Sequence, residues 1–307
     1  MSDQDGLPRI DAATFEKPLL DLAETVAQKV FREAASKLSA PGYVALDMFV
    51  MIRQAMNTCH LLFYINADER REGDCNWKPA YTFVTAPLVR SIIDCLYNLT
   101  FILEAPGVND PAFRKSGFKK ELQDLEEDKK RYTGRTDWDQ YFKKKSEGLD
   151  LMMRSSGLTT AEVMAQRPWK TLGKYLIDKG AGGILTPHQT FLRIFTYGMW
   201  REYSAIAHGG FEGLLDTGIF FTRDAQSHDL RQKMDDEFPK MMSLHMARAA
   251  LILLCIVTEM QGHFHFDGAN IGPRIHAIWN ALMPAFEVKE LYDERYSKLM
   301  SDSGIKP

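Results

Sequence analysis

The chain has few cysteines and no long run of purely apolar residues. Its four cysteines, at positions 59, 75, 95 and 255, form no close pair, which argues against a zinc site or a disulfide framework. The longest apolar stretch, Ala249–Val257, is shorter than the roughly 20 residues of a membrane-spanning helix. Residues 1–10 are polar and acidic and lack the apolar run of a signal peptide. We therefore expect a cytoplasmic protein without a membrane partner.

An excess of positive charge is also absent. The 38 lysines and arginines are balanced by 41 aspartates and glutamates, so the formal net charge is -3. Proteins that bind duplex nucleic acid along an extended surface usually carry a clear positive excess, so this chain would need a local basic patch to do so. Apolar residues make up 45% and charged residues 26%, as in ordinary soluble globular proteins. Composition thus excludes a disordered or fibrous chain without indicating a reaction.

Several signatures of cofactor chemistry are missing. The sequence contains no Gly-x-x-x-x-Gly-Lys-Ser/Thr phosphate loop, no Gly-x-Ser-x-Gly turn and no His-Glu-x-x-His pair. One metal candidate remains, because His263, His265 and Asp267 would share a face if this segment were extended. We favour the alternative, in which the histidine rings pack at a helix end, and we expect no cofactor. A further ligand would have to come from His245, Glu259 or His276.

Apolar residues recur with helical periodicity along most of the chain, and strand signals are nearly absent. The pattern predicts an all-α fold, with residues 217–222 as the only strand-like piece. Predicted helices cover residues 13–38, 42–71, 81–105, 110–133, 137–156, 159–165, 171–179, 187–209, 227–261 and 271–301.

Polar and conformational signals predict where several helices begin and end. Helix starts are expected at Asp110-Pro111, at Thr159 with Glu162 three residues later, and at Pro187. Helix ends are expected at the glycines 107, 134, 157, 180 and 209–210.

The distribution of charge predicts a single helical domain over residues 1–307, with core helices at about 42–105 and 187–301. Residues 110–180 form a charged insertion, in which mixed signs at helical spacing favour a solvated face. An RNA-facing patch is the alternative, because eleven basic residues fall between Arg114 and Lys145. The large apolar residues concentrate in four helices that we expect to form the central bundle, 42–71, 81–105, 187–209 and 227–261.

The first polar stripe in an apolar helix begins at Arg90. Asp94 lies four residues later on the same helical face and is expected to pair with Arg90, because a buried charge is costly without a partner. Asn98 continues the stripe for another turn, and Tyr97 adds a hydroxyl beside it. This group is either a structural ion pair or part of a binding site.

A second polar stripe lies on the helix predicted over residues 187–209. Arg201 and His208 are seven residues apart and superimpose within about 20° of helical rotation. Ser204 lies between them, and Tyr197 lies one turn earlier. The negative end of the helix favours a protonated imidazole at His208, and an arginine beside such a histidine is suited to bind phosphate.

At these residues the chain resembles the HEPN superfamily, whose members are small helical bundles found among prokaryotic toxins, antiviral factors and RNA-processing enzymes. Arg201-x6-His208 is similar to the Arg-x4-6-His motif of that superfamily. Trp200-Arg201-x2-Ser204-x3-His208 together with Arg90-x3-Asp94 also resembles bacterial helical families of unknown function. The resemblance covers about half of the chain. It departs from the motif at Glu202, where active members often have Asn, Asp or His.

The resemblance implies a homodimer that cuts RNA without a metal, with Arg201, His208 and Ser204 as the candidate catalytic residues. Arg90, Asp94, Tyr97, Asn98 and Tyr197 would bind the RNA or nucleotide phosphate. Glu202 would repel phosphate. If the fold points Glu202 away from His208, phosphate can still bind, whereas a salt bridge to Arg201 would weaken the catalytic interpretation. The alternative function is a binding or scaffolding protein without catalysis, in which the same polar residues are structural.

Overall fold

The computed structural model describes residues 12–38, 41–71, 80–177, 187–208, 210, 222, 225–268, 270–283 and 286–302. The all-α prediction is confirmed, because these residues form helices and turns and contain no strand. The strand-like segment 217–222 lies outside the described residues except for Thr222, which is in a turn.

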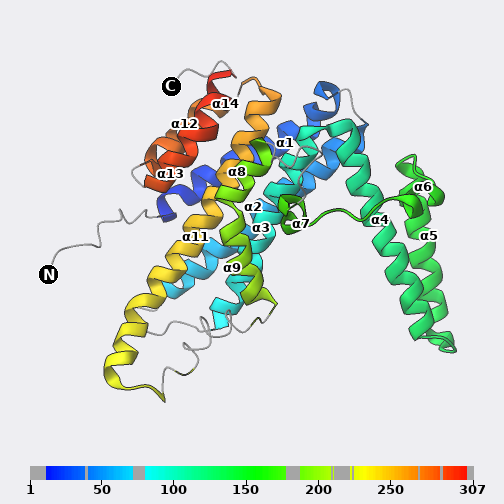
Figure 1. Ribbon diagram of the computed structural model, residues 1–307, viewed down its shortest axis with the longest axis horizontal. Helices are drawn as coiled ribbons and strands as arrows, with labels where there is room; N and C mark the ends of the chain where they lie inside the picture. Colours follow the sequence, from blue (N-terminus) through cyan, green and yellow to red (C-terminus); the bar gives the residue numbers. More distant parts are fainter. Residues whose placement is uncertain are drawn as a thin grey trace.

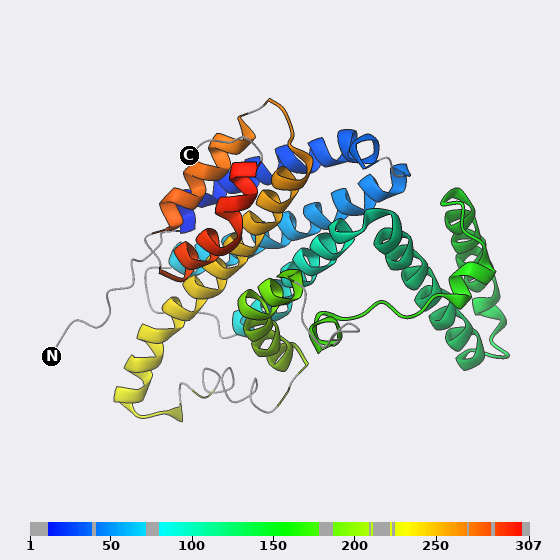
Figure 2. The ribbon, with the colours of Figure 1, turned by 45° about the horizontal axis from the view of Figure 1, so that its top comes forward.

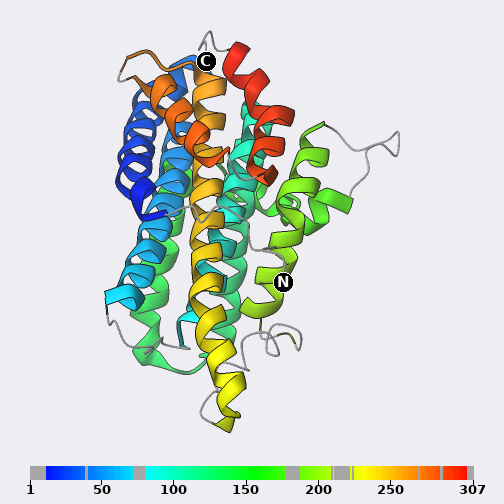
Figure 3. The same cartoon turned by 90° about the vertical axis from the view of Figure 1, so that its left-hand side faces the viewer.

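A bundle of long helices forms the body of the protein, and its make-up differs from the prediction (Figures 1 and 3). The N-terminal helix, which we did not place in the central bundle, lies inside it and packs closely against the next helix along the chain. Leu22, Val26 and Val30 are completely buried, so one apolar face of this helix is part of the core. The bundle helices are α1 (Ala12–Lys37), α2 (Gly42–Arg71), α3 (Ala80–Glu104) and α11 (His228–Phe264), with α9 (Tyr197–Ala207) against α3.

Two of the predicted helices are interrupted. The helix expected over 187–209 consists of α8 (Pro187–Phe195) and α9, with a turn at Thr196. The Thr196 hydroxyl donates to the Leu192 carbonyl oxygen at 2.8 Å, and the same oxygen accepts from the Thr196 amide at 2.9 Å. The helix expected over 271–301 is divided into α12 (Ile271–Leu282), α13 (Phe286–Leu291), a π-helical turn (Tyr292–Tyr296) and α14 (Ser297–Asp302).

The charged insertion forms an arm that projects from the bundle (Figures 1 and 2). Its two long helices are α4 (Pro106–Arg131) and α5 (Asp139–Ser155), joined through a short 3-10 turn (Thr136–Trp138). The arm has its own small apolar cluster, in which Leu125, Phe142 and Leu149 are buried. The chain returns through α6 (Thr160–Ala165) to α7 (Leu172–Ile177), whose Leu172 belongs to the main core.

The start and stop signals have mixed outcomes. At the start of α6, the Thr159 side chain accepts from the Glu162 amide, and Glu162 accepts from the Thr159 amide at 2.9 Å, as predicted. Gly134 and Gly157 have φ values of 85° and 68°, which confirms two of the predicted helix ends. The helix predicted over 81–105 ends at Glu104, within one residue of the prediction, but the predicted start at Asp110 is wrong, because α4 begins at Pro106 and contains Gly107. Proline is favoured at the first position of a helix, because the amide hydrogen that it lacks would have no intrahelical partner there.

Two of the core helices are long and apolar enough to cross a bilayer when judged by length and composition. These are Val84–Glu104 in α3 and His228–Phe264 in α11. The most apolar windows are 61% and 67% buried inside the protein, as is common for core helices of bundles. The length and composition of these two helices therefore do not show by themselves whether the protein contacts a membrane.

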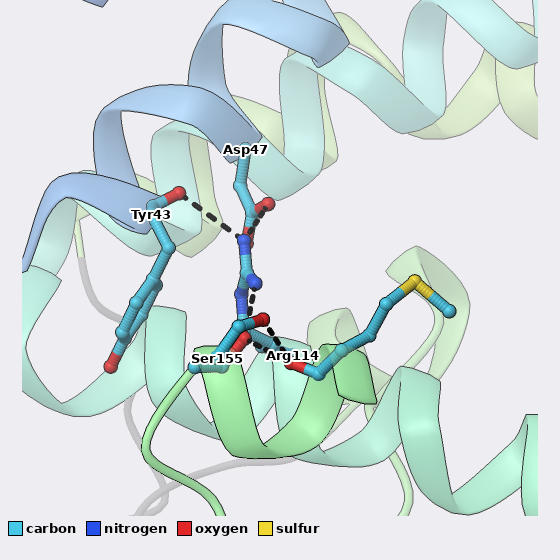
Figure 4. A network of polar contacts seen from close by, with 6 residues as sticks. Tyr43, Asp47, Arg114 and Ser155 are labelled. Atoms are coloured by element: carbon cyan, nitrogen blue, oxygen red, sulfur yellow. Dashed lines mark hydrogen bonds and ion pairs between the residues drawn. The ribbon is translucent and has the colours of Figure 1, made fainter. Parts of the chain in front are cut away.

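An arginine on α4 connects the arm to the bundle (Figure 4). The Arg114 guanidinium binds both carboxylate oxygens of Asp47 on α2, and its Nη1 donates to the Ser156 hydroxyl at 2.8 Å. It also lies 4.5 Å from the centre of the Tyr43 ring and donates to the Tyr43 carbonyl oxygen. A bidentate arginine–carboxylate pair fixes direction as well as distance, so this contact orients the root of the arm.

Asp110 lies one turn before Arg114 and is completely buried. Among the residues that the structure describes, neither of its carboxylate oxygens has a hydrogen-bond partner. Burial raises the pKa of Asp110 to about 7; the negative charge of Asp47 adds to this shift, and Arg114 opposes it. The root of the arm therefore contains a carboxyl group that remains protonated well above the usual range.

We predict that Asp110→Asn stabilises the protein at neutral and alkaline pH. An aspartate whose pKa is raised in the folded state costs increasing stability as the pH rises from about 4 to about 7, and the full cost remains above that range. Asparagine carries no charge, so the free energy of unfolding of the variant should exceed that of the unmodified protein by an amount that grows over the same pH range to at most about 4 kcal/mol. Urea unfolding between pH 4 and pH 9 measures this gain. Asp124→Asn, at an exposed position of the same helix, is the control and should show no such trend.

Candidate functional site

The two polar stripes predicted on separate helices meet where α9 packs against α3. The Arg90 Nη1 donates to the Ser204 hydroxyl, which in turn donates to the Trp200 carbonyl oxygen. The Arg90 Nε lies 3.2 Å from Asp94 Oδ2, which confirms the predicted ion pair. This Nε is buried without a well-aligned hydrogen bond, so the contact with Asp94 is mainly electrostatic. We call Arg90, Asp94, Trp200 and Ser204 the α3–α9 cluster.

Trp200 lies at the centre of this cluster and is absent from the residues predicted for the site. Its ring lies 4.3 Å from the Arg90 guanidinium, and its Nε1 donates to Asp94 Oδ1 at 3.2 Å. The indole therefore contacts both members of the ion pair from the neighbouring helix. The sequence signal was its position four residues before Ser204, which places both side chains on one helical face.

The cluster is only partly shielded from water. The Arg90 side chain is 17% exposed and that of Asp94 is 40% exposed. Burial raises the pKa of Asp94, while Arg90 and the Trp200 hydrogen bond oppose the shift. A partly exposed guanidinium of this kind is held in one orientation and still faces the surface on one side.

Tyr97 and Asn98 do not join the α3–α9 cluster. Tyr97 is 2% exposed, and its hydroxyl donates to the Lys170 carbonyl oxygen at 2.8 Å. Asn98 Oδ1 accepts from Trp169 Nε1 at 2.9 Å. Both partners belong to the chain between α6 and α7, so these two residues hold the segment that returns from the arm. Their predicted role in binding phosphate has no geometric basis.

Arg201, His208 and Tyr197 lie toward the solvent side of α9. Arg201 and His208 are exposed, and the His208 amide donates to the Ser204 carbonyl oxygen at 3.0 Å at the end of the helix. The Arg201 guanidinium lies 6.0 Å from the centre of the Tyr197 ring, which stacks near Trp200. Two of the three predicted catalytic residues therefore lie on the exposed surface of α9, whereas the third, Ser204, belongs to the α3–α9 cluster. We call Arg201 and His208 the α9 face.

Glu202 points away from Arg201. Both of its carboxylate oxygens accept from Arg248 Nη1 on α11, at 2.9 and 3.0 Å. The carboxylate of Glu202, the residue at which this chain departs from the HEPN motif, is therefore paired with Arg248 and not with Arg201.

A second set of polar contacts joins α9 to α11. Local sequence patterns do not predict these contacts. The Tyr203 hydroxyl accepts from Arg248 Nη1 at 3.1 Å and lies 2.7 Å from His245 Nδ1. Burial lowers the pKa of His245 to about 4, and the positive charge of Arg248 adds to this shift. His245 is therefore neutral at pH 7 and acts as a structural hydrogen-bond partner. The residues involved are more than 40 positions apart, so local periodicity could not pair them.

The other predicted sites have weaker geometry. His263 and His265 are both exposed, and His265 has a φ of 49° just after the end of α11. The His263 ring packs edge-on against Phe264 at 5.0 Å, in line with the packing alternative. Within the described part of the chain, no three histidine, cysteine or carboxylate side chains gather as metal ligands.

Charges on the arm are largely balanced by neighbours. Lys129 pairs with Glu126 at 2.7 Å, and Arg135 pairs with Asp137 at 2.9 Å. A surface cavity of about 530 Å³ lies at the tip of the arm, lined by lysines and carboxylates alike. This arrangement favours the solvated face over the RNA-facing patch that we considered as its alternative. The cavity is lined by Lys129, Tyr132, Thr133, Gly134, Asp139, Phe142, Lys143, Ser146 and Glu147.

Comparison of the chain with protein-family models, curated proteins and solved structures finds no match. The function is therefore inferred from the geometry of the cluster and of the α9 face.

We predict that Arg90→Ala lowers the free energy of unfolding by about 2 kcal/mol. The change removes a charged hydrogen bond to Ser204 and leaves the half-buried Asp94 without its cation, and each such loss typically costs about 1–3 kcal/mol. Urea denaturation followed by circular dichroism measures the effect. Arg193→Ala, at an exposed position on α8, is the matched control and should change stability by less than about 0.5 kcal/mol. Equal stability of the two variants would contradict a structural role for the cluster.

Proposed function

We propose that the α9 face binds phosphate groups of RNA. The observation that carries the proposal is the exposure of both Arg201 and His208, which helical spacing places on one side of α9, while Ser204 between them is bound by Arg90. A guanidinium supplies a forked pair of donors to phosphate oxygens, and an imidazole N–H supplies another. RNA is the phosphate source that the HEPN-like resemblance implies.

The charges around the α9 face are compatible with an anion. Within the described residues, Arg201 forms no ion pair, whereas the adjacent Glu202 is engaged by Arg248. The anionic side chain closest in sequence to the face is thus neutralised in place. This supports the proposal, because an unpaired carboxylate beside Arg201 would weaken phosphate binding.

The α3–α9 cluster has a positioning role in this proposal. Arg90 and Asp94 hold Trp200 and Ser204 from the α3 side, and Tyr203 is held from the α11 side. With both sides of α9 fixed, the spacing between Arg201 and His208 is constant. A preorganised pair loses less conformational entropy when a ligand binds.

Cleavage without a metal is the chemical step that the resemblance adds. The ribose 2′-oxygen would attack the adjacent phosphorus, forming a cyclic phosphate and breaking the bond to the 5′-oxygen of the next nucleotide. His208 would accept the 2′-hydroxyl proton and return a proton to the leaving oxygen, while Arg201 stabilises the charge on the phosphoryl oxygens. Replacing the 2′-hydroxyl by hydrogen would block this step and leave phosphate binding intact.

A non-catalytic scaffold is the second candidate function, and one observation favours it. The members of the cluster bind mainly one another, because Arg90 contacts Asp94, Ser204 and the Trp200 ring, and Trp200 also donates to Asp94. In this case the α9 face would be ordinary solvated surface, and the polar contacts would serve only to hold α9.

We predict that Arg201→Ala and His208→Ala each weaken binding of a fluorescently labelled single-stranded RNA by about tenfold. The loss of one charge-assisted contact to phosphate is worth about 1.4 kcal/mol or more. Fluorescence anisotropy at low and moderate salt measures the affinity, which should fall as salt rises. Arg193→Ala is the control for loss of one positive charge and should bind as the unmodified protein does.

Two further outcomes separate binding from cleavage and from scaffolding. Gel analysis of the same RNA should show cleavage that His208→Ala abolishes and that a 2′-deoxy strand resists, if the chemical step occurs. Binding that neither substitution weakens would exclude the α9 face as the phosphate site and would leave the scaffold as the remaining function.

A further inference from the structure

The outer face of α2 carries a stripe without charge. Six exposed positions follow one another at helical spacing over about 27 Å of the helix. The four apolar members are 42 to 63% exposed, although side chains of this kind are usually buried in a core or an interface. None of the six is charged, in a chain of which 26% is charged. The α2 stripe consists of Leu46, Val50, Gln54, Asn57, Leu61 and Tyr64.

The order of residues in the α2 stripe is symmetric about its centre. Two apolar residues lie at each end, and the two amides, Gln54 and Asn57, lie in the middle. If a second α2 packs antiparallel on the first, Val50 of each copy lies opposite Leu61 of the other, and Leu46 lies opposite Tyr64. The amides then face each other across the two-fold axis, where each side chain has both a donor and an acceptor to offer.

The charges that border the α2 stripe are already paired within the chain. Arg53 binds Glu24 on α1, and Asp47 binds Arg114 on α4. The exposed His60, which also borders the stripe, lies 3.6 Å from the Glu16 carboxylate on α1. Covering the stripe would therefore leave no unpaired charge at its edge, which is the main cost of closing a polar interface. A charged partner such as RNA or an acidic peptide would find no complementary group along the stripe.

We propose that the α2 stripe is the interface through which two copies of this chain form an antiparallel, two-fold dimer. In such an isologous contact the same patch is used by both copies, as the symmetric order of the stripe requires. Phe31 on α1 is 50% exposed and lies against Phe49, so it extends the apolar surface beside the stripe. A contact of this length is at the low end of stable interfaces, which bury about 800 Å² per partner, so the dimer dissociates on dilution.

This dimer is independent of the proposed RNA site. The α2 helix and the α9 helix lie on opposite sides of the bundle (Figure 3). The two α9 faces therefore point away from the interface, and each copy carries a complete face of its own. Loss of the dimer and loss of RNA binding are separate measurements on separate variants.

Sedimentation velocity of the full chain over a hundredfold range of concentration tests the proposal. We expect a shift from monomer to dimer as the concentration rises, and we expect Val50→Asp to abolish the dimer because it places a charge in the interface. Leu151→Asp, at a 68% exposed position on α5, is the matched control and should retain the dimer. Circular dichroism confirms that each variant is folded.

A double variant tests the antiparallel register. Val50→Asp combined with Leu61→Lys places opposite charges across from each other only in an antiparallel contact, and it should restore the dimer that Val50→Asp abolishes. A monomer at every concentration of the unmodified chain would overturn the proposal. A folded Val50→Asp variant that remains dimeric would do so as well, and failure of the double variant to restore the dimer would exclude the antiparallel register.

Discussion

The guanidinium of Arg90 is the contact on which the arrangement of α9 depends. It joins α3 to α9 through Ser204 and the Trp200 ring, and Asp94 on its own helix balances its charge. On the opposite side, Tyr203 and Glu202 are bound by residues of α11. A helix of eleven residues has little stability of its own in water. Its position therefore comes from polar contacts on two sides together with the apolar residues that it buries.

Much of the fold follows from local patterns in the sequence. Apolar periodicity predicts the long helices α2, α3 and α11, because a strong local pattern is sufficient to define an amphipathic or buried helix. The same reasoning predicted α1 as a helix but did not predict its place in the central bundle, because its small alanine and valine residues pack closely in the core without forming a conspicuous apolar run. It also failed at Thr196 and in the C-terminal region, where short interruptions depend on tertiary packing rather than on propensity.

The candidate site was predictable only in part, for a related reason. Helical spacing predicts the pairing of Arg90 with Asp94, which the structure confirms, because both residues lie on α3. Arg201 and His208 are both exposed, and their common face remains a prediction from helical spacing. The partners of Tyr97 and Asn98 come from a segment some 70 residues away, and no periodicity predicts such a contact. The sequence context of Asp110 is typical of a helix start. Burial of its carboxyl group depends instead on how the arm packs against the bundle, which local patterns do not predict.

The arm is attached at one end, which has a mechanical consequence. Its first helix has 26 residues and is about 39 Å long, so a rotation of about 10° at the root displaces the far end by roughly 7 Å. The Arg114–Asp47 contact and the buried Asp110 lie at that root. Small rotations at the root of the arm therefore produce larger displacements of the cavity at its tip.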